Sequence, residues 1–136
     1  MVDVDTQQKD YMSQYQERAK GLRRLLLATR NSWAGLKTAF VNEAAFRQEI
    51  ILSLFLIPIT LILPISVLFK VYLFCSIVII LVSELLNSSI EVIVDALSPE
   101  YNLWAKQAKD LGSAAVFLSL INSFISFLAA IATAFL

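Results

Sequence analysis

Two long stretches without a charged side chain constrain this chain more than any other feature. Residues 50–69 are apolar apart from a few hydroxyl groups and prolines, and residues 111–136 carry no charge. Each stretch is long enough for a helix that crosses a hydrocarbon core of about 30 Å. A third apolar run, residues 71–83, reaches that length only if its helix continues past Glu84. The sequence therefore predicts an all-α membrane protein with three spans, at about residues 46–66, 70–95 and 108–134.

Composition agrees with a membrane protein and excludes several classes of function. Of the 136 residues, 58% are hydrophobic and 16% are charged. A chain of this size cannot bury so much apolar surface in one soluble core. The formal net charge of zero gives no reason to expect a nucleic-acid partner. The single cysteine, Cys75, excludes a disulfide framework, and the absence of histidine excludes every mechanism that needs an imidazole.

Basic residues are distributed unevenly around the predicted spans. Most of them precede the first span, Lys106 and Lys109 lie between the second and the third, and only Lys70 falls in the turn after the first. Because cytoplasmic loops carry an excess of Lys and Arg, we expect the N-terminus and the second loop in the cytoplasm. Residues 1–20 are polar with both signs of charge, which does not fit a cleaved signal peptide, and we expect them to form a polar tail.

The segment before the first span has the spacing of an amphipathic helix, at about residues 21–41. Its apolar stripe consists of Leu22, Leu25, Leu26, Thr29, Trp33, Leu36 and Phe40. Such a stripe with Trp and basic flanks is typical of a helix that lies in the cytoplasmic membrane interface. A helix packed on its own transmembrane bundle is the alternative, and the two are compatible. Asn42 fits a helix cap with Glu43 in the first turn of the next helix, and residues 21–136 are expected to form a single membrane domain.

Polar residues recur along one face of the predicted second span: Glu84, Asn87, Ser88, Glu91 and Asp95. At about 100° per residue these side chains share one stripe of a helix. Each acidic group at membrane depth costs about 2.5–3.5 kcal/mol on insertion scales. A stripe that only packs helices together would use Ser, Thr or Asn. Three acids on one face repel one another, so the pattern indicates a functional site that binds a cation or a proton.

Further charged residues are expected at the same depth: Glu43, Glu49, Lys109 and Asp110. The last two fall in residues 105–113, which we interpret as the loop that leads into the third span. Several carboxylates with a few lysines, and no His or Cys, suit a hard cation such as Mg²⁺. A charge network that only holds the bundle together would have the same composition.

The small number of glycines excludes the common phosphate-binding loops. The only glycines are Gly21, Gly35 and Gly112, so neither a P-loop nor a Gly-rich kinase loop can be built. Any bound phosphate must therefore be held by metal and side chains. Two possibilities remain from the residues alone: carboxylate base chemistry with Mg²⁺, or transport of cations or protons along the acidic stripe.

Three longer motifs decide between these possibilities: residues 42–49 (NEAAFRQE), 84–95 (ELLNSSIEVIVD) and 108–115 (AKDLGSAA). In order and spacing they resemble the bacterial integral-membrane diacylglycerol kinase family, and the resemblance runs from about Leu22 to the C-terminus. It implies a homotrimer of three-span chains, each with an amphipathic N-terminal helix, in the bacterial cytoplasmic (inner) membrane. It also implies active sites that neighbouring subunits share at the cytoplasmic face, where ATP with Mg²⁺ phosphorylates the hydroxyl of a membrane lipid.

The resemblance assigns roles by position. Glu84 matches the catalytic carboxylate, which acts as general base, and Glu43 and Glu91 match the metal ligands. The positions around the nucleotide are Arg24, Asn31, Glu43, Asn87, Glu91, Asp95, Glu100, Tyr101, Asn102, Lys109 and Asp110. The positions near the lipid are Arg24, Ser32, Trp33, Glu49, Glu84 and Ser113.

Some positions bear on the lipid substrate. Asn31 and Asn102 stand where the family often has an aromatic residue and a histidine. The loop at residues 98–101, together with residues 105–107, is similar to the undecaprenol kinase branch. Residues 42–49 and 112–115 are similar to the diacylglycerol branch. Diacylglycerol, which would become phosphatidic acid, is the expected substrate, and undecaprenol is the alternative. A small proton-coupled transporter with Glu84 as its carrier is the alternative from another class.

Overall fold

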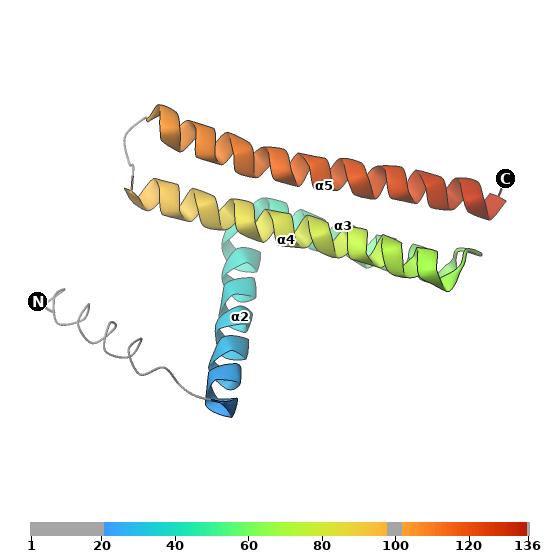
Figure 1. Ribbon diagram of the computed structural model, residues 1–136, viewed down its shortest axis with the longest axis horizontal. Coiled ribbons are helices and arrows are strands. Elements are labelled where there is room, and N and C mark those ends of the chain that lie inside the picture. Colours follow the sequence, from blue (N-terminus) through green and yellow to red (C-terminus); the bar gives the residue numbers. More distant parts are fainter. Residues whose placement is uncertain (1–20, 98–101, 136) are drawn as a thin grey trace, which may run out of the picture. The chain divides into compact units, whose positions relative to one another are not determined.

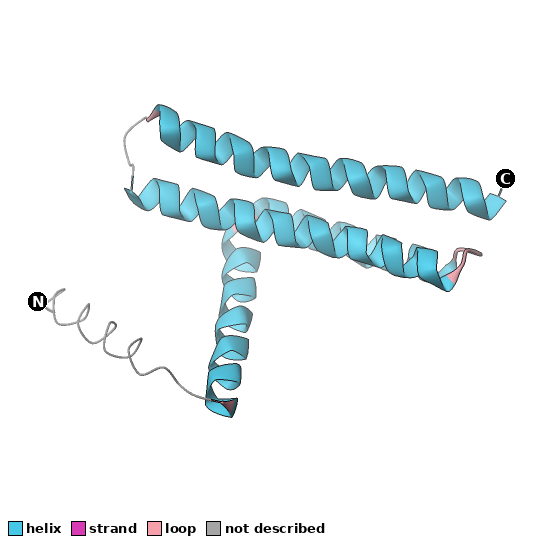
Figure 2. Ribbon diagram, in the orientation of Figure 1, coloured by secondary structure: helices cyan, strands magenta, loops and turns pink. Residues whose placement is uncertain are grey.

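The computed structural model describes residues 21–97 and 102–135 of the chain (Figure 1). The described residues divide into two compact units, residues 21–37 and the residues from 38 onward. The described residues contain four helices and no strand (Figure 2): α2 (Leu22–Asn42), α3 (Ala44–Ile62), α4 (Val67–Leu97) and α5 (Leu103–Phe135). The all-α prediction is confirmed. The predicted polar tail and the loop at residues 98–101 lie outside the described residues.

Three of the helices are long and apolar enough to cross a membrane. They are α3, α4 and α5, with 19, 31 and 33 residues. Many of their large apolar side chains face outward, including Phe55, Leu68 and Phe117, which are 66%, 81% and 62% exposed. Lipid tails are a favourable environment for such side chains, and water is not. The three-span prediction is confirmed, and the chain is a multi-pass membrane protein.

A single non-helical residue, Glu43, separates α2 from α3. Its backbone is extended, with φ −98° and ψ 116°, and it is the N-cap of α3. The prediction that Asn42 caps this helix is wrong, because the Glu43 N–H still donates to the Ala39 carbonyl and keeps Asn42 within α2. Arg47 caps the end of α2: its Nη1 donates to the carbonyls of Phe40 and Val41, at 3.1 and 2.8 Å. Within the described part of the chain, the Glu43 side chain makes no capping hydrogen bond.

The turn between α3 and α4 is closed by side chains on both of its flanks. Lys70 Nζ donates to the Leu61 carbonyl at 2.6 Å and so caps the end of α3. Ser66 Oγ accepts a hydrogen bond from the Phe69 N–H at 3.3 Å, which caps the start of α4. Lys70 lies on the first turn of α4 and not in the connecting turn itself, and it satisfies a local carbonyl. Its presence there is compatible with the orientation that the other basic residues predict.

Helix α5 begins earlier than expected. The prediction of a loop at residues 105–113 is wrong, because these residues are helical from Leu103 onward. Asn102 Oδ1 accepts a hydrogen bond from the Trp104 N–H at 2.9 Å, which starts the helix. Lys106 Nζ and Asp110 Oδ2 form an ion pair at 2.5 Å, one turn apart on the same face, which supports the first turns.

Helices α4 and α5 lie side by side over most of their length (Figure 1), and α3 packs against α4. The face that α5 buries is made of small residues three, four or seven positions apart: Gly112, Ser119, Ser123, Ser126 and Ala130. The core near the start of α4 joins Leu63, Leu73 and Ala130. Small residues let two helices approach closely in a membrane, where packing and interhelical hydrogen bonds hold helices together.

Candidate active site

The packing face of α4 changes from apolar to polar halfway along the helix. Leu73, Ile77 and Ile80 are buried at spacings of three and four residues, and Glu84 and Asn87 continue the same series. Glu84 is 5% exposed and Asn87 is 9% exposed. Both polar side chains thus occupy positions that helix packing assigns to core residues. Ser88 is buried beside them, Glu91 is half-buried, and Asp95 is exposed.

Four carboxylates surround this stretch of α4. The Glu84 side chain interacts electrostatically with Glu91 on its own helix and with Glu43 at the start of α3. It interacts in the same way with Glu49, which lies on the first turns of α3 and is 9% exposed. The buried Oε2 of Glu49 makes no hydrogen bond to any described residue. Four like charges at this separation repel one another, so the cluster is suited to a cation. The structure therefore brings together the two predicted metal ligands and the predicted base.

Asn87 is oriented by a neighbour on each side. Its Nδ2 donates to Glu91 Oε1 at 3.1 Å, one turn further along α4. Its Oδ1 is buried and has no hydrogen-bond partner among the described residues. On α5, Gly112 leaves room for this oxygen, because a Cβ at position 112 would lie 2.5 Å from Asn87 Oδ1. Gly112 is thus a site residue that sequence reasoning missed. Its sequence signals are that it is the one glycine within an apolar span and that it belongs to the motif at residues 108–115.

The predicted lysine of the site, Lys109, lies nearer the end of α4. Lys109 Nζ contacts Asp95 Oδ1 at 2.5 Å and joins α5 to α4, so the two side chains lie at the same level along this pair of helices. Asp110 pairs with Lys106 at the start of α5. Asp95 lies eleven residues after Glu84 on α4, which corresponds to about 16 Å of helix. Lys109 of the same chain is therefore next to the acidic stripe but distant from Glu84.

The acidic residues can be tested against the needs of Mg²⁺. No group of three His, Cys, Asp or Glu side chains within metal-binding distance occurs among residues 21–97 and 102–135. Mg²⁺ at a phosphate-transfer site usually takes only one or two carboxylates, because water and substrate phosphates supply its other ligands. Glu43, whose carboxylate has no capping role, and Glu91, which Asn87 orients, match that requirement.

The remaining predicted site residues are distributed over three parts of the chain. Arg24, Asn31, Ser32 and Trp33 lie on α2 within the first unit, and all four are exposed. Ser32 Oγ donates to the Ala28 carbonyl of its own helix at 3.0 Å. Ser113 is exposed next to Gly112 on α5, and Asn102 is exposed at the start of that helix. Glu100 and Tyr101 lie outside the described residues.

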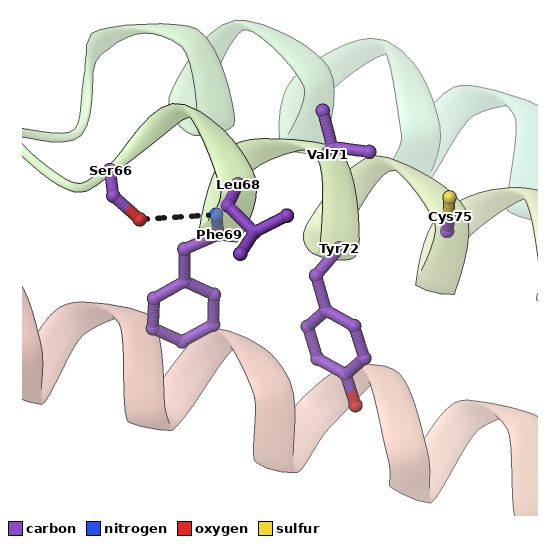
Figure 3. Close-up of a pocket in the computed structure, with 6 residues that line it drawn as sticks. All are labelled: Ser66, Leu68, Phe69, Val71, Tyr72 and Cys75. Carbon is purple, nitrogen blue, oxygen red and sulfur yellow. Dashed lines mark hydrogen bonds between the residues drawn. The ribbon is translucent and has the colours of Figure 1, made fainter.

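A separate pocket of about 590 Å³ lies at the start of α4 (Figure 3). It is lined by Ser66, Leu68, Phe69, Val71, Tyr72 and Cys75. Phe69 and Tyr72 point toward α5, whereas Val71 points away from it (Figure 3). The lining carries no carboxylate or basic side chain, so it offers no group for acid–base or phosphate chemistry. The acidic cluster around Glu84 is the candidate active site.

Comparison with known proteins agrees with this assignment. Residues 30–131 match the family described as prokaryotic diacylglycerol kinase. The chain is 40% identical to the diacylglycerol kinase of Escherichia coli K12 over 106 residues, which cover 78% of this chain and 87% of that protein. It is 45% identical to the diacylglycerol kinase of Pseudomonas aeruginosa over 100 residues, covering 74% of this chain and 81% of that protein. The corresponding protein of Helicobacter pylori is 43% identical over 109 residues, with coverage of 76% and 81%. The family expected from the three motifs is confirmed: the chain belongs to the prokaryotic diacylglycerol kinase family.

Proposed function

We propose that this protein transfers the γ-phosphoryl group of ATP to the hydroxyl of diacylglycerol, with phosphatidic acid as the product and Glu84 as the general base. Membership of the family makes the chain a lipid kinase. One observation carries the finer proposal: Glu84 is almost fully buried within a cluster of three further carboxylates. A buried acid in that position has no packing role, since an apolar side chain would serve there.

Glu84 has the chemistry and the position that a base requires. A lipid hydroxyl must lose its proton as it attacks the γ-phosphorus, and a carboxylate within hydrogen-bond reach can accept that proton. Among the described residues no hydrogen bond occupies the Glu84 carboxylate. Its place on α4, between an apolar half and a polar half of the packing face, suits a substrate with a polar head and apolar tails.

Glu43 and Glu91 would hold Mg²⁺. When bound, Mg²⁺ offsets the negative charge of the phosphates and polarises the transferring phosphoryl group. Asn87 supports this role, because its amide holds Glu91 in one orientation. The metal would also offset the repulsion between the carboxylates that surround Glu84.

The other residues of the site fall into two groups. Those proposed to bind the nucleotide, besides Asn87 and the metal ligands, are Arg24, Asn31, Asp95, Glu100, Tyr101, Asn102, Lys109 and Asp110. Those proposed to bind the lipid, besides Glu84, are Arg24, Ser32, Trp33, Glu49 and Ser113. The exposed apolar side chains of α2, among them Leu25 and Trp33 at 63% and 72%, support a position of that helix in the membrane interface.

The proposed function also includes an assembly and a location in the cell. The protein is a homotrimer with active sites shared between subunits, in the cytoplasmic (inner) membrane of a bacterium, with its active site on the cytoplasmic face. The excess of basic residues before α3 and between α4 and α5 supports this orientation. Within one chain Glu91 is half-buried and Asp95 is exposed, so the three spans cover the polar face of α4 only in part, which supports an oligomer.

Diacylglycerol is the preferred lipid because the relatives in Escherichia coli, Pseudomonas aeruginosa and Helicobacter pylori are all named for it. Undecaprenol is the second candidate, supported by the composition of residues 98–101. A proton-coupled transporter with Glu84 as carrier leaves the Lys109–Asp95 pair and Asn87 without a role.

The direct test is a phosphorylation assay with the purified chain in mixed micelles that contain Mg²⁺, labelled ATP and one lipid. We expect labelled phosphatidic acid with diacylglycerol, and much less product with undecaprenol at equal mole fraction. A preference for undecaprenol would show that undecaprenol is the substrate, with the same phosphoryl-transfer reaction. No phosphorylation of either lipid would refute the proposed function, and the transporter would then be tested by proton flux in vesicles.

A further inference from the structure

Two hydrogen bonds between serine hydroxyls join α4 to α5 inside the membrane-spanning region. Ser76 Oγ and Ser123 Oγ are 3.2 Å apart, and Ser83 Oγ and Ser119 Oγ are 2.8 Å apart. Three of these serines are at most 6% exposed: Ser76, Ser119 and Ser123. Ser83 is half-buried and directly precedes Glu84. One of the two bonds is therefore adjacent to the proposed base, and the other lies two turns away along α4.

The hydroxyl protons of each pair can be accounted for. Ser76 Oγ lies 2.7 Å from the Leu73 carbonyl, so Ser76 donates to its own helix and Ser123 donates to Ser76. In the second pair, both Ser83 and Ser119 can reach carbonyls of their own helices. One of them donates across the interface while the other donates to its own backbone. Each pair thus makes one bond between the helices and leaves no hydroxyl proton unused.

Side chains do not fill the whole interface between α4 and α5 near the proposed base. Between the Ser83–Ser119 bond and the Gly112 contact, the helices leave a groove of about 250 Å³. It is lined by Ser83, Leu86, Asn87, Ile90, Leu111, Gly112 and Ala115. Over the length of this groove, side chains offer little steric resistance to a slide of one residue, about 1.5 Å, so the register there depends on the contacts at its two ends.

The position of Asn87 in the candidate active site depends on the register of α5 on α4. Asn87 fits only against a residue without a Cβ, because a Cβ at position 112 would lie 2.5 Å from its Oδ1. A shift of α5 by one residue would bring a side chain to that place and displace Asn87 from Glu91. The Lys109–Asp95 contact, also between α4 and α5, depends on the same register.

We propose that Ser83 and Ser119 are positioning residues, whose hydrogen bond sets the register of α5 on α4 and thereby holds Asn87 between Gly112 and Glu91. The role rests on the proposed function for its effect on catalysis, but the register itself does not. Ser76 and Ser123 make the same kind of bond two turns away, where no site residue depends on it. They provide a matched control within the same pair of helices.

The catalytic test compares Ser119→Ala and Ser83→Ala with Ser123→Ala and Ser76→Ala. Interhelical hydrogen bonds in membranes are modest, so we expect the first two variants to lower kcat by about 3- to 15-fold. The double variant should be no slower than either single one, because the bond is lost once. Ser119→Thr, which keeps the hydroxyl, should restore kcat.

The control variants should lose thermal stability to a similar extent while kcat stays within twofold of wild type. Equal effects of all four alanine variants on kcat would overturn the proposal.

A second measurement needs no substrate. Nitroxide labels at Val92 and Gln107, both exposed, report the distance between α4 and α5 in Cys75→Ser chains diluted with unlabelled chains. We expect Ser119→Ala to broaden or shift this distance and Ser123→Ala to leave it unchanged. An unchanged distance in Ser119→Ala would refute the positioning role even if the protein is a diacylglycerol kinase. A shifted distance would support the role even if Glu84 proves not to be the base.

Discussion

Glu84 occupies a position where the packing pattern of α4 calls for an apolar side chain. Its neighbours in the same series, Ile77 and Ile80, are at most 4% exposed and purely apolar. An acid at this depth opposes membrane insertion by about 2.5–3.5 kcal/mol, and the nearby acids add to that cost. Such a cost is retained where a side chain does chemistry. At the scale of single residues, the acidic cluster is therefore explained by function and not by stability.

The metal ligands give the first prediction. Glu91→Gln removes one charged oxygen ligand, so the Mg²⁺ concentration needed for half-maximal rate should rise at least about 10-fold. Glu43→Gln should act in the same direction. Ser89→Ala is the matched control, because Ser89 is exposed on the same turn of α4 and bonds only to its own backbone. Rates measured across an Mg²⁺ titration check this prediction. Unchanged Mg²⁺ dependence in both glutamine variants would show that Glu43 and Glu91 are not the metal ligands.

At the scale of helices, the close approach of α5 to α4 at Gly112 is the most restrictive contact of the site. Gly112→Ala would bring a Cβ to 2.5 Å from Asn87 Oδ1, so Asn87 must rotate and lose its bond to Glu91. We expect at least about a 10-fold loss of rate with the helices still formed, since an oriented ligand is lost. Helix content is followed by circular dichroism.

Gly35→Ala is the control for this prediction. A Cβ at position 35 meets nothing within 4 Å, so the same substitution adds a methyl group without a clash. It should leave the rate unchanged and raise the stability of α2 by up to about 1 kcal/mol. Equal loss of activity in the two variants would show that the Asn87 contact is not the cause.

The sequence predicted some elements better than others, for physical reasons. The spans follow from apolar runs, which the bilayer makes decisive. The start of α5 was missed because Lys106 and Asp110 read as a polar loop, whereas they pair one turn apart on a helix. The serine pairs were missed because a serine in an apolar run does not reveal its partner. Only the antiparallel register of α4 and α5 brings Ser83 to Ser119.

Only part of the candidate site could be predicted from the sequence. The stripe on α4 follows from helical spacing alone, and the structure places Glu84, Asn87 and Glu91 together. The sequence predicted Glu43 at the depth of the acidic stripe, whereas its proximity to Glu84 depends on how α3 packs on α4. The role of Gly112 depends on a contact between helices, which no local pattern contains.

At the scale of the whole molecule, the separation of Lys109 from Glu84 within one chain bears on the proposed shared sites. Lys109 pairs with Asp95 of its own chain, about 16 Å along α4 from Glu84. If Lys109 serves the phosphates beside Glu84, it does so from another chain. Mixed oligomers of inactive Glu84→Gln and inactive Lys109→Ala chains should then regain part of the activity.

The control mixture combines Glu84→Gln with Glu91→Gln. These residues interact on one helix of one chain, so both serve the same site, and every site of a mixed oligomer lacks one of the two. No recovery is expected from that mixture. Recovery in neither mixture would contradict shared sites for Glu84 and Lys109, even if the protein is a trimer by crosslinking.

The central claim is that Glu84 is the base of a lipid kinase, and the rate of phosphoryl transfer to diacylglycerol by Glu84→Gln tests it most directly. At saturating Mg²⁺ and ATP, kcat should fall by about 10²–10⁴-fold, the usual contribution of a general base, while ATP affinity and thermal stability are retained. Glu84→Asp, which keeps a carboxylate, should retain more activity than the glutamine variant. A kcat for Glu84→Gln within a few-fold of wild type would contradict the account and assign the proton transfer to another group.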